Sequence, residues 1–416
     1  MGDLRSSKKI CISLAAHLRS MVFLGILVNK MAAMRSLRTV AFFVVALQFV
    51  RPTPALAQLS TLEHVSKPGF WPTKVLPTPA EFVGVSVCAK CHSKIADLQK
   101  TTPMAQSLLK VANSDALLKH TELTLQLGQY GYEIKTTPAG SIYSVTDGER
   151  KTTAPLIWAF GGGQVGQSYL FERDGRWYEA HVSYFGSLEG LQITPGRGSD
   201  PVRDMEGATS RTLTREDVVR CFKCHATGIT SEHAITTTIS PGITCEACHG
   251  PGAKHAAQKQ IEILATGGSV GGENADILNP GRLSPGDSVD FCGGCHATTW
   301  DVRLAGNKGI QSLLSPPSRL QKSKCWGNGD ERLTCVACHD PHTLRVREAE
   351  YYDAKCLACH APAGQTISAE HPQPACKVGS SKCVTCHMPK LEVPDFYHSF
   401  PDHRIRIVRA GEPFPE

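Results

Sequence analysis

The sequence predicts a mainly α-helical fold with extensive loops and one small antiparallel β insertion. Three observations lead to this prediction. Gly and Pro together make up about 15% of the 416 residues and aromatic residues only 7%, which is typical of a loop-rich chain with a modest side-chain core. A short motif of cysteine and histidine recurs seven times. Residues 121–183 show the alternation and turn residues of short strands.

Residues 1–57 are interpreted as an N-terminal extension and signal peptide. Arg35 and Arg38 precede an apolar run from Thr39 to Val50, and Ala55-Leu56-Ala57 is a small-x-small cleavage site. The run is too short to span a bilayer. Because residues 1–30 would be redundant before such a signal, we expect translation to start at Met31 or Met34. Cleavage near Ala57 predicts an exported mature chain with no stable membrane span.

The positive charge of the chain belongs to this N-terminal segment. The whole sequence has a formal net charge of +6. Residues 1–57 contain eight Lys or Arg and one Asp, so the remainder has a net charge of −1. This balance gives no argument for a nucleic-acid partner or an anionic membrane surface.

The recurring motif is Cys-x-x-Cys-His, the attachment site of c-type haem. Two thiols three positions apart can add to the two vinyl groups on one edge of a porphyrin, and the adjacent histidine then ligates the iron. The sequence therefore predicts seven covalent haems c. The copies are Cys88/Cys91/His92, Cys221/Cys224/His225, Cys245/Cys248/His249, Cys292/Cys295/His296, Cys335/Cys338/His339, Cys356/Cys359/His360 and Cys383/Cys386/His387.

Three other interpretations of these cysteines are weaker. Zinc ribbons use paired Cys-x-x-Cys but need no histidine after each pair. A thioredoxin-like redox site would have one such pair beside a βαβ pattern, not seven. Disulfides between residues three positions apart would close only short loops, which stabilise a fold little. Haem attachment also occurs outside the cytoplasm, in agreement with the predicted signal.

The positions of the motifs divide the mature chain into three parts. We expect an N-terminal segment with the first haem at 58–120, the β insertion at 121–200 and a hexahaem domain of short helices and loops wrapped around haems at 201–416. Ser93–Leu118 has a helical composition interrupted at Pro103. Turn signals such as Asp174-Gly175 separate the expected strands, which are Thr121–Leu127, Tyr132–Thr136, Ile142–Thr146, Leu156–Phe160, Ser168–Glu172 and Trp177–Ser183.

Histidines outside the motifs are candidates for the sixth iron ligand. A closed sixth position is typical of an electron carrier and an open one of a catalyst. His255 and His342 follow their own motifs too closely to reach over the same haem, so we expect each to bind a neighbouring one. His181 lies in an expected strand, where an ordinary sheet histidine is the simpler interpretation. The candidates in the predicted mature chain are His64, His120, His181, His233, His255, His342, His371, His398 and His403. Nine candidates for seven haems mean that the number of histidines does not require any haem to keep an open sixth position.

The C-terminal segment is expected to return to the haems as an extended arm. Pro389 and Pro394 disfavour a continuous helix after the seventh motif. We expect His403, or failing that His398, to be a distal ligand; a solvated tail is the alternative. Three arginines of this arm suit haem propionates, namely Arg404, Arg406 and Arg409.

Cys325 and Cys376 lie outside the motifs. In an oxidising compartment they can form one disulfide, closing a loop of about 50 residues and worth roughly 3–4 kcal/mol. Two free thiols are the alternative.

Several longer segments carry a resemblance to a known family. They are Thr102–Ser107, Gly161–Leu170, Trp177–Phe185, Cys245–Gly252 with His255, Cys335–His342, and Cys383–Lys390 followed by His398 and Asp402-His403. Over most of Val83–Val408 the chain resembles the bacterial multihaem cytochromes c of the cytochrome c-554-like (c-552/4 domain) group. The resemblance implies periplasmic electron transfer along stacked haems with mostly two histidines on each iron. Enzymes of the wider superfamily act on nitrogen or sulfur oxyanions, but this chain lacks the Cys-x-x-Cys-Lys variant that marks one such catalytic haem.

The resemblance also draws attention to Met104. Many members of the wider group have a histidine after the first motif, whereas this chain has Met104, twelve residues past His92. A methionine ligand raises the haem potential relative to histidine. An apolar residue packed beside Leu108 is an equally good interpretation.

The sequence thus predicts an exported, periplasmic heptahaem c-type cytochrome that relays single electrons. The expected partners are other redox proteins or a membrane quinol-linked donor. The alternative is a multihaem oxidoreductase acting on a small nitrogen or sulfur oxyanion at a five-coordinate haem. No catalytic side chain is assigned.

Overall fold

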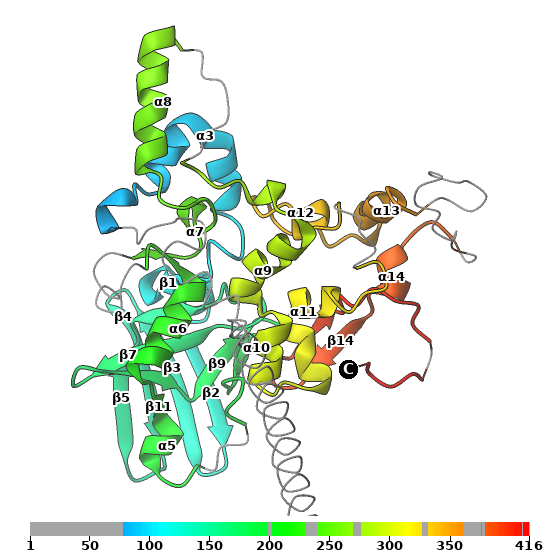
Figure 1. The fold of residues 1–416 in the computed structure, drawn as a ribbon. Helices are drawn as coiled ribbons and strands as arrows, with labels where there is room; N and C mark the ends of the chain where they lie inside the picture. Colours follow the sequence, from blue (N-terminus) through cyan, green and yellow to red (C-terminus); the bar gives the residue numbers. More distant parts are fainter. Residues whose placement is uncertain are drawn as a thin grey trace, which may run out of the picture. The chain divides into compact units, whose positions relative to one another are not determined.

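The computed structural model describes residues 78–198, 202–229, 239–268, 276–326, 332–360, 376, 379–409 and 411–415 (Figure 1). All of these belong to the compact unit Ser60–Glu416. The predicted signal peptide and the candidate ligands His64, His233 and His371 lie outside the described residues. Within the described ranges, no helix has the length and apolar character needed to cross a bilayer.

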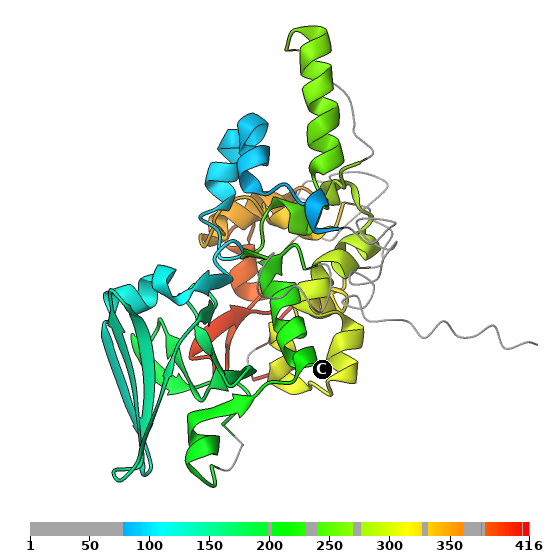
Figure 2. The ribbon, with the colours of Figure 1, turned by 90° about the vertical axis from the view of Figure 1, so that its left-hand side faces the viewer.

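Two antiparallel sheets form a β region, coloured cyan to green in Figures 1 and 2. The first has the order β2-β3-β4-β5, with strands β2 Glu122–Leu127, β3 Tyr130–Thr137, β4 Gly140–Thr146 and β5 Lys151–Pro155. The second has the order β1-β6-β7-β8-β11, with strands β1 Leu108–Lys110, β6 Trp158–Phe160, β7 Ser168–Arg173, β8 Arg176–Ala180 and β11 Ser210–Thr212. A separate pair joins β9 Val182–Phe185 to β10 Gly190–Ile193.

A row of buried side chains sets the register of the four-stranded sheet. Leu123 is paired with Ile134, Ile134 with Tyr143, and Tyr143 with Ala154, and all four are buried. Because side chains alternate between the faces of a sheet, a shift by one residue would expose the whole row. Burying a large apolar side chain contributes about 1.5–3 kcal/mol. The main apolar cluster of the described residues lies between Val111 and Ala208, so the β region has its own core.

The hairpin between β7 and β8 confirms a predicted turn. Asp174 and Gly175 have φ values of 52° and 72°, the left-handed conformations of a two-residue type I′ turn. Arg173 and Arg176 form the last pair of the ladder.

The prediction of a mainly α-helical fold with a small β insertion is wrong. The described residues contain fifteen strands in five antiparallel sheets, and those of the β region extend from Leu108 to Thr212. Leu108–Lys110, expected to be helical, is a strand paired with β6. The expected strand Trp177–Ser183 breaks at His181 into β8 and β9, which belong to different sheets. Strands this short form through pairing partners that are distant in the sequence, and such pairing overrides local helix propensity.

The other described residues form short helices and loops. The α-helices are α3 Val85–Gln99, α4 Asp115–Lys119, α5 Met205–Thr209, α6 Arg215–His225, α7 Cys245–His249, α8 Ala253–Thr266, α9 Pro285–His296, α10 Thr299–Leu304, α11 Pro316–Leu320, α12 Cys335–Cys338, α13 Ala349–Leu357 and α14 Cys383–His387. The 3-10 helices are η1 Pro79–Glu81, η2 Val111–Asn113, η3 Pro280–Arg282 and η4 Gly309–Leu314. Two small hairpins pair β12 Ala226–Thr227 with β13 Ser240–Pro241, and β14 Lys390–Val393 with β15 His398–Pro401.

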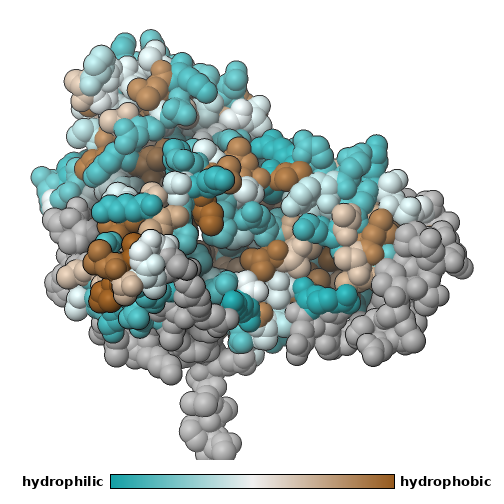
Figure 3. Space-filling model, turned by 90° about the horizontal axis from the view of Figure 1, so that it is seen from above, coloured by the Kyte–Doolittle hydropathy of each residue, from teal (hydrophilic) through white to brown (hydrophobic). Residues whose placement is uncertain are grey.

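The helical part buries few apolar side chains. From residue 239 onward, the described residues include only four buried aliphatic or aromatic ones, Val289, Val302, Leu313 and Val393. Helices α8, α12 and α14 bury none of their residues. On the face shown in Figure 3, hydrophobic side chains form separate areas among hydrophilic ones. From residue 239 onward, side-chain packing of the β-region kind therefore does not hold the described helices together, whereas α6 buries Val218, Val219 and Phe222 against the five-stranded sheet.

Candidate haem-binding sites

Each Cys-x-x-Cys-His motif includes a short helical turn. Helices α7 and α14 coincide with the third and seventh motifs, and α6 and α9 end at the histidines of the second and fourth. The first motif lies inside α3, which is kinked at His92. Residues three apart on a helix lie on the same face, so each turn brings two sulfur atoms to one side. All fourteen motif cysteines are at least partly exposed.

Three motif histidines are oriented by backbone carbonyl groups. The Nδ1 atoms of His225, His249 and His387 lie 2.8, 2.8 and 2.9 Å from the carbonyl oxygens of Ser107, Leu278 and Arg406. A carbonyl only accepts, so Nδ1 carries the proton and Nε2 keeps its lone pair. This is the arrangement of metal-bound histidines, whose second nitrogen donates to a carbonyl or carboxylate.

Three motif histidines also lie near a second histidine at almost the same separation. The ring centroids are 6.5 Å apart for His92 and His255, 6.1 Å for His249 and His342, and 6.2 Å for His339 and His403. Two imidazoles that bind a metal ion from opposite sides have centroids about 6 Å apart, because each bond is about 2 Å and each centroid lies roughly 1 Å behind its nitrogen. The residues present therefore fit the haem iron that the motifs predict, and the helical part lacks a large side-chain core that would compete for the space.

Burial favours the neutral form of the imidazoles of the third pair. It lowers the pKa of His403 to about 4 and lowers the pKa of His339 below the ordinary value. A neutral imidazole is the form that ligates a metal. These side chains thus need to lose no proton at neutral pH before binding iron.

Six predicted haem-binding residues are more exposed than the others. They are Cys91 and His92 of the first motif, Cys295 and His296 of the fourth, His360 of the sixth and Cys386 of the seventh. Among the described residues, neither a second histidine ring nor a carbonyl group orients the imidazole of His360. The turn itself is formed, because the amides of Cys359 and His360 donate to the carbonyl of Cys356 at 3.1 and 2.9 Å.

Helix α14, which contains the seventh motif, buries none of its residues. The assignment of all motif residues to haem stays a prediction that rests on the motif itself.

The other predicted ligands lie elsewhere. Nε2 of His120 is 3.2 Å from the hydroxyl of Tyr184, in the β region. His398 lies in β15 with its ring 5.1 Å from that of Phe400. The carbonyl of Met104 accepts a hydrogen bond of 2.9 Å from the amide of Ile243, just before the third motif. Within the described residues His92 lies against His255, and a role for Met104 at the first haem stays a prediction.

The first and third motifs are joined by one buried carboxylate. Glu246, inside the third motif, accepts hydrogen bonds from the amides of Val83 at 2.9 Å and Gly84 at 2.8 Å, just before α3. Its Oε1 also accepts from the amide of Gly252 at 2.8 Å. The neighbouring thiol of Cys245 raises the pKa of Cys88 above its ordinary value.

The fourth motif contacts two others. Sγ of Cys224 in the second motif lies 3.6 Å from the carbonyl of Gly294 in the fourth. The amide of Cys335 in the fifth motif donates to Ser288 of α9 over 3.3 Å. Helix α9 is thus the common neighbour of the second and fifth motifs. The second motif also adjoins the third, because the amide of Gly242, just before the third motif, donates to the carbonyl of His225 over 3.0 Å.

The last three motifs follow one another. Helix α12 of the fifth motif contacts α13, which contains Cys356 of the sixth. Asp353 of α13 accepts from the amides of Lys382 and Cys383 at 2.7 and 2.8 Å, at the start of the seventh. The motifs therefore adjoin one another in the order one, three, two, four, five, six, seven.

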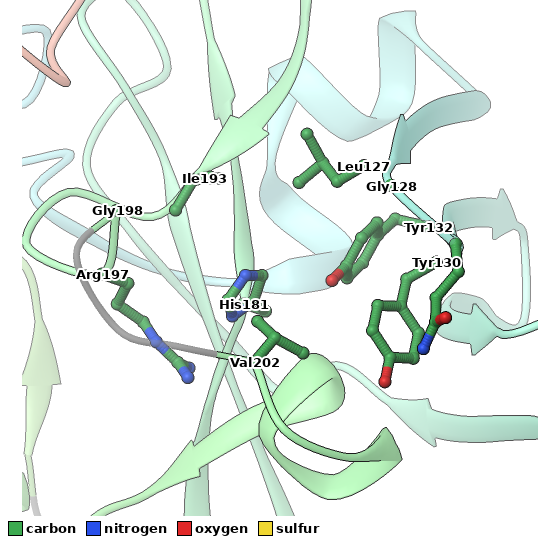
Figure 4. Close-up of a pocket in the computed structure, with 10 residues that line it drawn as sticks. Leu127, Gly128, Tyr130, Tyr132, His181, Ile193, Arg197, Gly198 and Val202 are labelled. Carbon is green, nitrogen blue, oxygen red and sulfur yellow. The ribbon is translucent and has the colours of Figure 1, made fainter.

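A separate pocket of about 410 Å³ lies in the β region (Figure 4). His181 is at its centre, with its ring 5.7 Å from that of Tyr132, and Arg197 and Val202 also line it. No motif residue is among its lining residues. The pocket is therefore distinct from the candidate haem sites.

The carbonyl groups that orient the motif histidines could not be found from the sequence. Ser107 and Leu278 are far from their partners along the chain, and any residue can supply a carbonyl. Arg406, expected at a haem propionate, donates to Asp402 and Glu412 instead. Within the described part of the chain, Cys325 forms no disulfide.

Comparison with known proteins supports this site chemistry. Residues 198–250, which contain the second and third motifs, match the family described as cytochrome c554 and c-prime. No curated protein matches the chain. Among solved structures, the outer cell wall cytochrome OcwA is similar with a TM-score of 0.37 and 16% identity, over 78% of this chain and 80% of that one.

Proposed function

We propose that this chain is an exported heptahaem c-type cytochrome, with covalently bound haem c, that relays single electrons between redox partners; the match of residues 198–250 to the cytochrome c554 and c-prime family supports this. When bound, each haem supplies a one-electron iron couple whose potential depends on its axial ligands and surroundings. The protein supplies attachment, orientation and spacing.

The unbroken series of contacts between motifs is the observation that carries this proposal. Electron transfer between cofactors weakens steeply with distance, so a relay needs each site to adjoin the next. Every motif contacts at least one other, through Glu246, α9, α12 or Asp353. A chain that used one haem for catalysis would need no such continuity across all seven.

The histidine pairs support relay over the catalytic alternative. Two imidazoles on one iron leave no position for a substrate, and three sites have such a pair at the required separation. The pocket around His181 has no motif residue among its lining, so it offers no support for oxyanion chemistry at an open haem. The proposed partners are other redox proteins or a membrane quinol-linked donor, met outside the cytoplasm after cleavage near Ala57.

Two measurements test the proposal. The intact mass of the mature protein should exceed that of the chain from Gln58 by seven haems, and a count of five or fewer would refute it. Electron paramagnetic resonance (EPR) of the oxidised protein should show low-spin ferric haem only. A stoichiometric high-spin signal would reveal an open site and favour the oxidoreductase alternative.

A further inference from the structure

Arg319 and Asp402 form an ion pair from which solvent is excluded. Both side chains have an exposed fraction of 0%. Nε and one terminal nitrogen of Arg319 donate to the two oxygens of Asp402, each over 2.8 Å. Arg319 lies on α11, and Asp402 directly follows β15 in the C-terminal arm.

The carboxylate of Asp402 organises the arm around it. Its Oδ1 also accepts from the amide of Arg404 at 2.9 Å, and its Oδ2 from the guanidinium of Arg406 at 2.7 Å. Arg319 donates further to the carbonyl of Pro415 at 2.8 Å and lies 4.5 Å from the ring centroid of Phe414. Arg319 therefore joins α11 to the C-terminal arm at two places, Asp402 before His403 and Pro415 after it.

Two candidate haem ligands depend on this arm. His403 follows Asp402, its carbonyl accepts from Ser323 at 2.9 Å, and its ring lies 6.2 Å from that of His339 in the fifth motif. The carbonyl of Arg406 accepts from Nδ1 of His387, in the seventh motif, over 2.9 Å. The carboxylate of Asp402 thus holds the chain beside both the His403–His339 contact and the His387–Arg406 hydrogen bond.

We propose that the Arg319–Asp402 pair is a positioning device for two haem sites at once. It places His403 as the distal ligand of the fifth site and holds the Arg406 carbonyl that orients His387 in the seventh. The inference rests on the proposed function only in that both sites bind haem. A buried ion pair is often no more stabilising than apolar residues of the same size, whereas its bidentate geometry fixes orientation.

The test compares Arg319→Met with Arg211→Met, which breaks the exposed Arg211–Glu179 pair of 2.9 Å in the β region. EPR spectra and stepwise redox titrations are recorded on purified holoprotein. In Arg319→Met we expect one low-spin signal to be converted to high-spin and a second to shift its g values, with the other signals unchanged. Arg211→Met should match the wild type.

A double variant separates positioning from stability. Arg319→Met with Asp402→Leu removes both charges, so no unpaired charge remains in the interior and folding should be preserved. If the pair positions ligands, the double variant keeps a near wild-type Tm but retains the altered spectrum. Spectra and potentials identical to wild type in the double variant would overturn the inference. Wild-type protein whose mass lacks the haems of the fifth and seventh motifs would instead overturn the proposed function.

Discussion

Replacing Glu246 with alanine should detach the residues before α3 from the third motif. Glu246 is 5% exposed and accepts three backbone hydrogen bonds, from Val83, Gly84 and Gly252. A hydrogen bond to a charged group contributes about 1.5–3 kcal/mol, so losing three removes about 4–9 kcal/mol if the amides stay dry. Because Val83 and Gly84 are only partly buried, water can reach them. We therefore expect the lower limit, about 4 kcal/mol.

Such a loss should appear as local opening rather than global unfolding, because the β region has a core of its own. Hydrogen exchange of the amides at residues 83 and 84 would accelerate by about a thousandfold for 4 kcal/mol. Glu246→Gln keeps one acceptor oxygen and should show an intermediate effect. Glu172→Ala, at an exposed carboxylate of β7, is the control. Unchanged exchange at both amides in Glu246→Ala would refute the reasoning.

Three further predictions concern ligation, attachment and acid stability. In His255→Ala, EPR should show one low-spin haem converted to high-spin, because the ring of His255 lies 6.5 Å from that of His92. The control variant His120→Ala should leave the spectrum unchanged. Equal spectra in both variants would contradict the pairing of His255 with His92. Cys221→Ala with Cys224→Ala should lower the intact mass by one haem, and an unchanged mass would show that this motif is not loaded. Two backbone amides hold the pKa of Asp353 below its ordinary value of 3.8. A carboxyl group whose pKa is lowered in the folded state stabilises the fold at pH values above its ordinary pKa. This stabilisation is lost as the pH falls through the pKa of the folded state. The stability difference between wild type and Asp353→Asn should therefore shrink below pH about 4; a difference that stays constant in acid would disprove this role.

The sequence predicts features that depend on local spacing. The strands β2 to β4 and the Asp174-Gly175 turn follow from alternation and turn residues. The attachment motifs are contiguous, so their chemistry is visible without a structure. The rings of His255 and His342 lie beside His92 and His249, which belong to other motifs. That these two histidines bind the neighbouring haems stays a prediction.

Features that depend on distant segments could not be predicted. The three-residue strand β1 exists because β6, some 50 residues away, pairs with it. Arg319 follows two prolines in a short helix and has no sequence feature that announces a buried ion pair. Its partner, Asp402, lies 83 positions along the chain. Such contacts are properties of the assembled fold, not of any local pattern.

The uneven distribution of buried apolar side chains has a consequence for biogenesis. The β region can collapse on its own, because its core consists of its own side chains. The helical part offers few such contacts, so before cofactor attachment it should stay loose enough for a haem ligation machinery to reach each cysteine pair. Every porphyrin added then supplies apolar surface that the polypeptide lacks. Haem attachment and folding of the helical part are therefore expected to occur together.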